Sequence, residues 1–491
     1  MKKEVVFKDS GNESLICRII YTIENKSQNI YIPSNYAKAM LPQIFKAYDI
    51  RGLYPEELDQ DTAYRIGRAF VCFLQCSHVI VGHDMRASSK PLSEALIRGL
   101  TDQGADVTFI GLCSTPMLYF AAKAVEAAVM ITASHNPARY NGFKLCRNNC
   151  IPISGDTGIK DVQALAASNT FPSCARKGKV TKKEVLQDYI QYNLSFLSLL
   201  SPRTKPLTIV VDTGNGMGGL DFPAVFKNIP SCTYIPLYHE LDGNFPNHEA
   251  NPIKEENLHD LQQEVLASHA DLGIATDGDG DRCILVDEKG KTVTADLMLA
   301  LIAQYLLEKK KGQESTAILY DLRSSNIVPE TILACGGTPV MSRVGHSFVK
   351  KLMREKNIPF GGELAGHFYY QENEYAESTI ITAMLLLNIL CDHSNGQKQL
   401  SELVQPFRKY YHSGEINFAV SDKEGAMKRI VTALPDGKFI TLDGIKIEYP
   451  TWWCSVRASN TEPVLRLIVE AKMEEEMERM KAKITKIVQK S

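Results

Sequence analysis

Residues 127–137 read AAVMITASHNP, five apolar residues followed by a short polar turn. The apolar run 127–131 is typical of a strand that is buried on both faces, and Asn136-Pro137 ends any regular element soon afterwards. We therefore expect Ser134 at the exit of a buried strand. Open α/β sheets bind their ligands at this edge, so the position suits a nucleophile.

Ser134 alone is weak evidence for catalysis. Most Ser-His pairs are ordinary loop residues, and no G-x-S-x-G elbow surrounds this one. We also expect the His135 ring to point away from Ser134, because consecutive side chains at a strand exit take different directions. The case for chemistry at Ser134 therefore depends on motifs elsewhere in the chain.

Strands and helices alternate on both sides of this stretch. The pattern predicts strands at 78–82, 105–110, 207–212 and 317–321, and helices at 91–100, 117–125, 184–196, 295–307 and 379–390. Such alternation is typical of α/β domains. From about residue 409 the pattern changes to strands at 416–420, 439–442 and 464–469 and a charged helix at 474–488, which indicates a small α+β domain.

Composition argues against several functions. The 491 residues carry 55 Lys and Arg against 57 Asp and Glu, so no basic field favours nucleic acid. The 12 cysteines include no C-x-x-C pair, which argues against a disulfide scaffold or a zinc ribbon and favours a reducing compartment. No signal peptide or membrane span is predicted, so we expect a cytoplasmic protein. Residues 1–40 show no clear periodicity, and we treat them as an extension of unknown role.

The segment Asp277-Gly278-Asp279-Gly280-Asp281-Arg282 places three carboxylates on alternate residues. In an extended segment they project to one side, where the cluster is unstable unless a cation fills it. A few hard oxygen ligands favour Mg²⁺. An EF-hand loop competes, because Glu288 falls at its twelfth position, but Arg282 takes the place of the required glycine and the flanks are predicted strands. A solvated acidic turn stays open.

Two further loops carry groups that suit a phosphosugar. Residues 361–367 hold Glu363 and His367 among glycines, and carboxylate and imidazole are natural partners for sugar hydroxyls. Arg457-Ala458-Ser459-Asn460-Thr461 follows a strand and offers a guanidinium, hydroxyls, an amide and turn N–H groups, which suit a phosphate. Each loop alone is weak evidence, because polar turns are common.

Together these four stretches resemble the α-D-phosphohexomutase family, most closely its bacterial phosphomannomutase/phosphoglucomutase group. The resemblance runs from about Phe45 to the C-terminus. Residues 45–52, 320–325 and 343–347 look like further signatures of this family. Several ordered motifs over about 450 residues make chance agreement implausible.

The resemblance implies an α/β fold class, with three mixed α/β domains and a C-terminal α+β domain around a central cleft. After the extension 1–40, we place domain I at 41–180 with the phosphoserine loop and domain II at 181–291 with the metal loop. Domain III at 292–408 carries the sugar-binding loop, and domain IV at 409–491 carries the phosphate-binding loop.

The resemblance also implies roles for single residues. The serine that matches Ser134 carries the phosphoryl group in this family and holds Mg²⁺ together with the aspartates that match Asp277, Asp279 and Asp281. Further catalytic candidates are Lys144, Arg51 and His367 for proton handling and Arg282 for charge balance. Substrate-binding candidates are Tyr48, Arg323, His346, Glu363, Ala365, Arg457, Ser459, Asn460 and Thr461. A lysine base needs a lowered pKa, which we expect from a cationic, partly dry cleft.

The implied activity is the interconversion of hexose 1-phosphate and hexose 6-phosphate through a phosphoserine and a hexose 1,6-bisphosphate, which is both intermediate and activator. The implied partners are phosphosugars, with no nucleic acid and no membrane, and we expect a monomer or a weak oligomer. Ala365 stands where relatives usually have serine, and Arg323 where some have lysine. The alternatives are a phosphoglucosamine mutase and a phosphosugar-binding protein without turnover.

Overall fold

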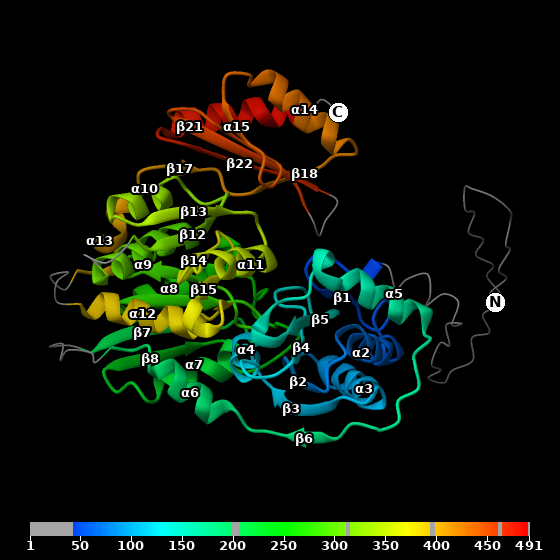
Figure 1. Cartoon of the computed structure of the whole chain (residues 1–491). Helices are drawn as coiled ribbons and strands as arrows, with labels where there is room; N and C mark the ends of the chain where they lie inside the picture. The colour runs from blue at the N-terminus through cyan, green and yellow to red at the C-terminus, as the bar shows by residue number, and fades with distance from the viewer. Residues whose placement is uncertain (1–42, 199–205, 311–314, 393–397, 460–463, 490–491) are drawn as a thin grey trace, which may run out of the picture. The chain divides into compact units, whose positions relative to one another are not determined.

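Four β-sheets with their helices make up the part of the chain that this computed structural model describes (Figure 1). The described residues are 43–198, 206–310, 315–392, 398–459 and 464–489. The predicted extension 1–40 lies outside them, as do two predicted substrate contacts, Asn460 and Thr461. None of the described helices is long and apolar enough to span a membrane.

The first sheet is built around β4 (Ala127–Ile131), in which all five residues are buried. Its strand order is β1-β5-β4-β2-β3-β6. β4 pairs in parallel with β2 (His78–His83) and antiparallel with β5 (Tyr140–Arg147), which places Lys144 opposite Met130. The other elements are β1 (Ile50–Leu53), β3 (Asp106–Leu112), β6 (Val180–Lys182), α2 (Gln60–Leu74), α3 (Ser89–Asp102), α4 (Thr115–Ala121) and α5 (Lys160–Ser168).

The second sheet has the order β11-β10-β9-β7-β8. β9 (Leu272–Thr276) is parallel to β7 (Leu207–Asp212) and antiparallel to β10 (Cys283–Asp287). The connection between β9 and β10 is the aspartate loop, residues 277–282, so buried strands hold it at both ends. The other elements are β8 (Cys232–Leu237), β11 (Thr292–Val293), α6 (Leu186–Leu194), α7 (Gly218–Phe226) and α8 (His259–Ala267).

The third sheet has the order β13-β12-β14-β15-β16 and shares one hydrophobic core with the second. β12 (Ala317–Asp321) is parallel to β14 (Phe360–Gly362), which pairs antiparallel with β15 (Phe368–Tyr370). The turn between β14 and β15, residues 363–367, is the loop predicted to bind the sugar, and we call it the sugar loop. The other elements are β13 (Thr338–Ser342), β16 (Ala376–Glu377), α9 (Ala295–Lys309), α10 (Ile327–Ala334), α11 (His346–Lys356), α12 (Thr379–Cys391) and α13 (Leu400–Val404).

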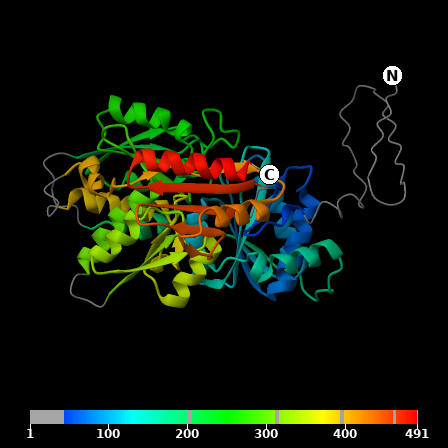
Figure 2. The same cartoon turned by 90° about the horizontal axis from the view of Figure 1, so that it is seen from above.

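The fourth sheet is antiparallel, in the order β17-β22-β21-β20-β19, and β18 also pairs with β22. β21 (Trp452–Ala458) and β22 (Val464–Ala471) place Arg457 opposite Arg466. Helix α15 (Glu474–Val488) runs along β22, with Met477 in the shared apolar cluster (Figure 2). The other elements are β17 (Tyr411–His412), β18 (Ile416–Ala419), β19 (Lys438–Ile440), β20 (Ile445–Glu448) and α14 (Lys423–Ala433).

The predicted fold class is confirmed, and several elements have the predicted bounds. The strands at 127–131, 207–212 and 317–321 and the helix at 474–488 match β4, β7, β12 and α15 residue for residue. Pattern reasoning missed β5, the strand that carries Lys144, because polar residues interrupt its apolar run. The central cleft and the four domain boundaries stay predictions.

Candidate active site

Ser134 lies three residues beyond β4 and is buried. Its φ of 52° is left-handed. This conformation costs a non-glycine residue about 1–2 kcal/mol, so surrounding contacts must hold it. Two are local: the Ser134 N–H donates to Thr132 Oγ1 at 2.9 Å, and the Asn136 N–H donates to the Ala133 carbonyl at 3.0 Å.

The Ser134 hydroxyl has two side-chain partners. Its Oγ donates to Asp277 Oδ2 at 2.7 Å and lies 3.2 Å from His135 Nδ1. The second contact corrects the expectation that the His135 ring points away, because the left-handed backbone at Ser134 brings the two neighbouring side chains together. Burial, with Arg282 and Arg51 nearby, holds the pKa of His135 well below its usual range.

The three carboxylates of the aspartate loop converge. One oxygen of each of Asp277, Asp279 and Asp281 lies within 4.8 Å of the others, and all three residues are buried. Lys144 reaches the same group from β5, where its Nζ donates to Asp279 Oδ2 at 2.6 Å and to Asp281 Oδ2 at 2.5 Å. Among the described residues, Asp279 Oδ1 and Asp281 Oδ1 are buried and accept no hydrogen bond. Buried carboxylate oxygens without a donor fit a hard divalent cation.

The surroundings of this cluster shift the pKa values of Asp277 and Lys144. Burial raises the pKa of Asp277 well above its usual range, and the neighbouring aspartates raise it further. For Lys144, burial lowers the pKa, but Asp279 and Asp281 outweigh burial and raise it above the usual value. This direction is opposite to the one expected for a lysine base. A cation bound to the same carboxylates would oppose the shift.

His367, at the end of the sugar loop, contacts the aspartate loop. Its Nε2 accepts from Arg282 Nε at 3.0 Å, and its Nδ1 lies 3.2 Å from the Asp281 carbonyl oxygen. Because a guanidinium only donates, the ring proton of His367 sits on Nδ1. Burial, reinforced by Arg282, lowers the pKa of His367 to about 3, so the ring is neutral.

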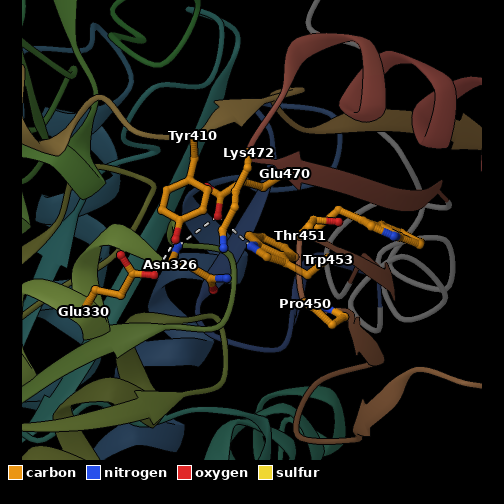
Figure 3. A pocket seen from close by; sticks show the side chains of 9 residues that line it. Asn326, Glu330, Tyr410, Pro450, Thr451, Trp453, Glu470 and Lys472 are labelled. Carbon is orange, nitrogen blue, oxygen red and sulfur yellow. Dashed lines mark hydrogen bonds between the residues drawn. The ribbon is translucent and has the colours of Figure 1, made fainter.

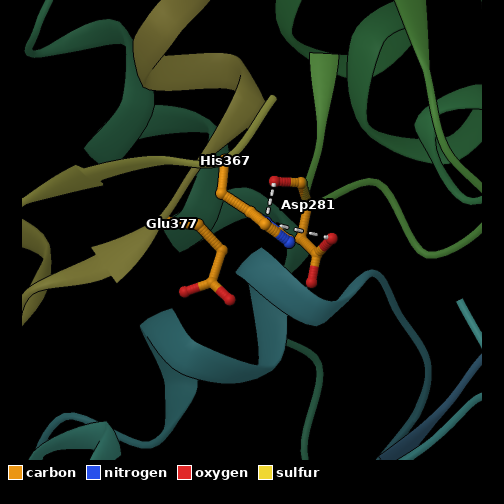
Figure 4. Close-up of side chains that lie close together, drawn as sticks. All are labelled: Asp281, His367 and Glu377. Carbon is orange, nitrogen blue, oxygen red and sulfur yellow. Dashed lines mark hydrogen bonds and ion pairs between the residues drawn. The ribbon is translucent and has the colours of Figure 1, made fainter. Parts of the chain in front are cut away.

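Glu377 lies close to the same histidine. Figure 4 shows the His367 ring between the carboxylates of Asp281 and Glu377, with one ligand atom of each within 4.8 Å of the others. Both ring nitrogens already make contacts, and the second carboxylate pairs with Lys350 at 2.5 Å. This trio is therefore a charge-balanced support of the site rather than a second metal position.

Glu363, at the start of the sugar loop, is buried. Its Oε1 accepts from the Gly345 N–H at 2.8 Å, and its Oε2 accepts from the Tyr369 hydroxyl at 2.5 Å. Burial raises the pKa of Glu363, and Asp321 raises it further. Ala365 lies in the middle of the loop, so no hydroxyl is present there.

Three arginines surround Glu415, which lies between β17 and β18. The distances from its carboxylate oxygens are 3.1 Å to Arg457, 3.6 Å to Arg323 and 2.9 Å to Arg466. Arg457 and Arg466 are direct cross-strand neighbours, and like charges in such pairs repel unless a counter-ion lies between them. Converging guanidinium groups suit a phosphate. Ser459 follows β21 directly.

Arg51, Tyr48 and His346 border these groups. Arg51 Nη1 donates to Asn136 Oδ1 at 2.6 Å. Asn136 belongs to residues 132–140, which we call the Ser134 turn. The Tyr48 hydroxyl donates to the Val344 carbonyl at 3.2 Å, and its ring centroid lies 6.0 Å from that of His346 in an edge-on contact. His346 begins α11, and burial holds its pKa well below the usual range.

Four segments of the chain match successive parts of one protein family. Residues 42–173, 187–290 and 294–410 match the alpha/beta/alpha domains I, II and III of phosphoglucomutase/phosphomannomutase, and residues 415–487 match its C-terminal domain. The chain belongs to the phosphoglucomutase/phosphomannomutase family.

Individual proteins that are similar to this chain have names from the same family. A phosphomannomutase of Escherichia coli is 41% identical over 438 residues, which cover 87% of this chain and 95% of that protein. The crystal structure of a phosphoglucomutase/phosphomannomutase family protein from Burkholderia thailandensis matches with a TM-score of 0.82 at 32% identity, over 91% of this chain and 97% of that one. The N-acetylphosphoglucosamine mutase of Aspergillus fumigatus, solved with GlcNAc-6P and magnesium, shares the fold with a TM-score of 0.59 at 14% identity, over 93% and 99% of the chains. Family membership makes this chain a phosphohexomutase, an isomerase.

In this family member, ten of the predicted site residues form two connected groups. The first contains Ser134, Lys144, Arg282, His367 and the three aspartates; the second contains Arg323, Glu363, Arg457 and, outside the prediction, Glu415. The sugar loop joins them, because Glu363 belongs to the second group and His367 to the first.

Sequence reasoning missed several residues at the site of this phosphohexomutase. Thr115 Oγ1 donates to Asp279 Oδ2 at 2.5 Å, and Arg86 contacts the Ser134 turn. Both follow strands that run parallel to β4, so the rule that led to Ser134 also pointed to them. Glu377 and Glu415 carry no such signal, because only the tertiary fold brings their partners to them.

A pocket lies outside both groups (Figure 3). Fully buried Glu470 accepts there from Trp453 Nε1 at 2.7 Å and from the Asn326 N–H at 3.0 Å. The lining residues are Asn326, Glu330, Tyr410, Pro450, Thr451, Trp452, Trp453, Glu470 and Lys472. None of them is a predicted site residue, and the carboxylates of buried Glu470 and exposed Glu330 do not suit a phosphate.

Proposed function

We propose that Ser134 exchanges a phosphoryl group with mannose or glucose phosphates through a hexose 1,6-bisphosphate. The observation that carries this proposal is the 2.7 Å contact of Ser134 Oγ with Asp277, beside a Lys144 that bridges the two other aspartates. The name of the Escherichia coli relative, phosphomannomutase, supports the mannose substrate.

The transfer exchanges one P–O bond for another. The bond from phosphorus to Ser134 Oγ breaks while phosphorus bonds to a sugar hydroxyl oxygen, and the hydroxyl proton passes to a basic side chain or to Ser134 Oγ. The bisphosphate then turns over, returns its other phosphoryl group to Ser134 and leaves as the isomer. Lys144, Arg51 and His367 are the candidates for proton handling, and His367 must first give up its hydrogen bond from Arg282.

Asp277, Asp279, Asp281 and Ser134 would hold Mg²⁺, which neutralises charge on the transferring group when it is bound. Arg282 Nε lies 3.7 Å from Asp277 Oδ2 and adds a fixed positive charge beside that group. Phosphoryl transfer depends mainly on positioning and electrostatic stabilisation, and these residues supply both.

The second group of residues binds the rest of the substrate. Arg457, Arg323 and Ser459 hold the phosphate that is not being transferred, together with Asn460 and Thr461 from the predicted loop. Glu363 accepts from the sugar hydroxyls, and Tyr48 and His346 line the approach. Ala365 makes no hydroxyl contact, so recognition of the sugar is relaxed at this position.

Replacement of Ser134 tests the covalent role. We expect Ser134→Ala to lower kcat by several orders of magnitude, because it removes the phosphoryl carrier, while binding of hexose phosphate largely survives. Intact mass of the wild type before and after phosphatase should reveal one phosphoryl group, absent from the variant. A variant that kept more than about a tenth of kcat would rule out this role.

A turnover panel with Mg²⁺ tests the substrate. Glucose and mannose 1-phosphates should differ in kcat/KM by no more than about tenfold, or about 1.4 kcal/mol, because Glu363 reads hydroxyls that the two sugars share. Faster turnover of glucosamine or N-acetylglucosamine 1-phosphate would move the protein to the phosphoglucosamine mutases. Binding without any turnover would make it a phosphosugar-binding protein.

A further inference from the structure

Arg86 lies three residues beyond β2, the parallel neighbour of β4, and so reaches the edge where Ser134 lies. Asp84 holds both the backbone N–H and the Nε of Arg86 in place. One Asp84 oxygen accepts from the Arg86 N–H at 3.0 Å and from Ser89 Oγ at 2.5 Å. The other accepts from Arg86 Nε at 3.2 Å, and both side chains are fully buried.

The rest of the guanidinium is bonded to the Ser134 turn. Its Nη2 donates to the carbonyls of Ser134 at 2.8 Å and Asn136 at 2.6 Å. Its Nη1 donates to the carbonyls of Pro137 at 2.8 Å and Tyr140 at 3.1 Å. Four carbonyls and one carboxylate therefore use all five N–H groups of Arg86, which is the full capacity of an arginine.

These contacts offset the unfavourable burial of the guanidinium charge of Arg86. Burial lowers the pKa of Arg86, and Asp84 opposes this effect. An arginine is retained in such a place only with excellent geometry, because a buried ion pair adds little stability compared with apolar residues of the same volume. The planar fork of five donors is the feature that no other side chain reproduces.

The segment that follows β8, in the second sheet, packs against Arg86. The Phe245 ring lies 5.0 Å from it, and at Gly243 a Cβ would meet Arg86 Cα at 2.6 Å. At Gly278, in the aspartate loop, a Cβ would meet the Ser134 carbonyl oxygen at 2.4 Å. The Ser134 carbonyl is therefore held between Arg86 and the loop that carries Asp277.

We propose that Arg86 is a positioning residue that fixes the left-handed Ser134 turn, so that Ser134 Oγ stays aligned with Asp277 for phosphoryl transfer. The inference rests on the proposed role of Ser134. The Arg86 guanidinium donates only to backbone carbonyls and Asp84, so it acts through Ser134 and not on the substrate. It should therefore affect kcat and leave the binding of hexose phosphate unchanged.

Arg86→Lys is the test, because it keeps the charge but offers only three donors that do not lie in a plane. We expect kcat to fall by about 100-fold, the loss that follows from a displacement of about 1 Å at a reacting atom. The Kd for glucose 1-phosphate should change by less than about threefold, since the phosphate is held by Arg457. The ³¹P resonance of the phosphoserine should shift, since the turn that surrounds it changes.

Arg68→Lys is the matched control. Its guanidinium donates to Gln103 Oε1 at the C-terminal end of α3, away from the Ser134 turn, so kcat and the ³¹P resonance should match the wild type. If Arg86→Lys does not fold, Asp84→Asn takes its place, and we expect a smaller loss of kcat at unchanged Kd. Wild-type kcat and an unshifted ³¹P resonance in a folded Arg86→Lys protein would overturn the inference, and so would equal losses in kcat and binding. A wild type without phosphoserine would instead overturn the proposed role of Ser134.

Discussion

Ser134 depends on one backbone angle. Its φ of 52° brings Oγ to Asp277 and also to His135, two contacts that an extended residue would not make together. Because a left-handed serine is strained, the conformation persists only where neighbours determine it, here Thr132 and the guanidinium of Arg86. Strain of this kind is typical of active sites.

Arg457 tests where the substrate phosphate is held. We expect Arg457→Ala to weaken the binding of either hexose monophosphate by about 1.5–3 kcal/mol, the scale of a charge-assisted hydrogen bond. Isothermal calorimetry measures this loss, and phosphorylation of Ser134 should continue. Arg479→Ala, which removes an exposed arginine of α15, is the control. An unchanged Kd for Arg457→Ala would place the phosphate elsewhere.

At the scale of elements, a buried ion pair joins α11 to β16. Lys350 Nζ lies 2.5 Å from Glu377 Oε2, and neither residue is exposed to solvent. We expect Lys350→Met to lower the free energy of unfolding by about 3–5 kcal/mol, because it leaves a carboxylate buried without a counter-ion. Denaturation in urea measures this change. The double variant Lys350→Met/Glu377→Leu should lose much less, and a double variant as unstable as the single one would contradict this account.

A second buried carboxylate lies where α4, α6 and α7 meet. Asp221 accepts from Ser114 Oγ at 2.5 Å, and burial raises its pKa to about 7. A raised pKa means that the folded state binds more protons than the unfolded state between about pH 4 and pH 7. The stability that Asp221 contributes is therefore lost as the pH rises through about 7.

Asp221→Asn removes this dependence. The melting temperature of the variant relative to the wild type should therefore increase between about pH 5 and pH 8, by the equivalent of a few kcal/mol at most. Calorimetry at the two pH values measures the difference. Asp188→Asn, at an exposed position of α6, should show no such change. A difference that stayed constant or fell with pH would contradict the buried, protonated state of Asp221.

At the scale of the whole molecule, the aspartate loop of one sheet meets Ser134 and Lys144 of another. We expect a chelator to lower turnover at least 100-fold and added Mg²⁺ to restore it, because the loop's charges need a cation during transfer. Mg²⁺ at about 100 times its Kd should also stabilise the fold by about 2.7 kcal/mol. Asp281→Asn should weaken that thermal shift, and full turnover in the presence of a chelator would exclude the metal role.

The sequence predicted much of the fold because secondary structure is local. β4, β7 and β12 are short apolar runs between polar turns, and α15 repeats its apolar residues every three or four positions, so their bounds follow from neighbours along the chain. The candidate loops were also found in this way, since the spacing of Asp277, Asp279 and Asp281 is itself local. Resemblance to a family then implied how these loops work together.

Only the tertiary structure decided which side chains meet. Lys144 bonds to Asp279 across 135 residues of sequence, and Arg86 reaches Ser134 across 48. The raised pKa of Lys144 depends on aspartates that a separate sheet supplies, and the buried state of Glu363 depends on segments that are distant along the chain. Periodicity along one segment holds no information about these contacts. Each contact depends on the distance in space between two segments, and the number of residues between them in the chain does not determine that distance.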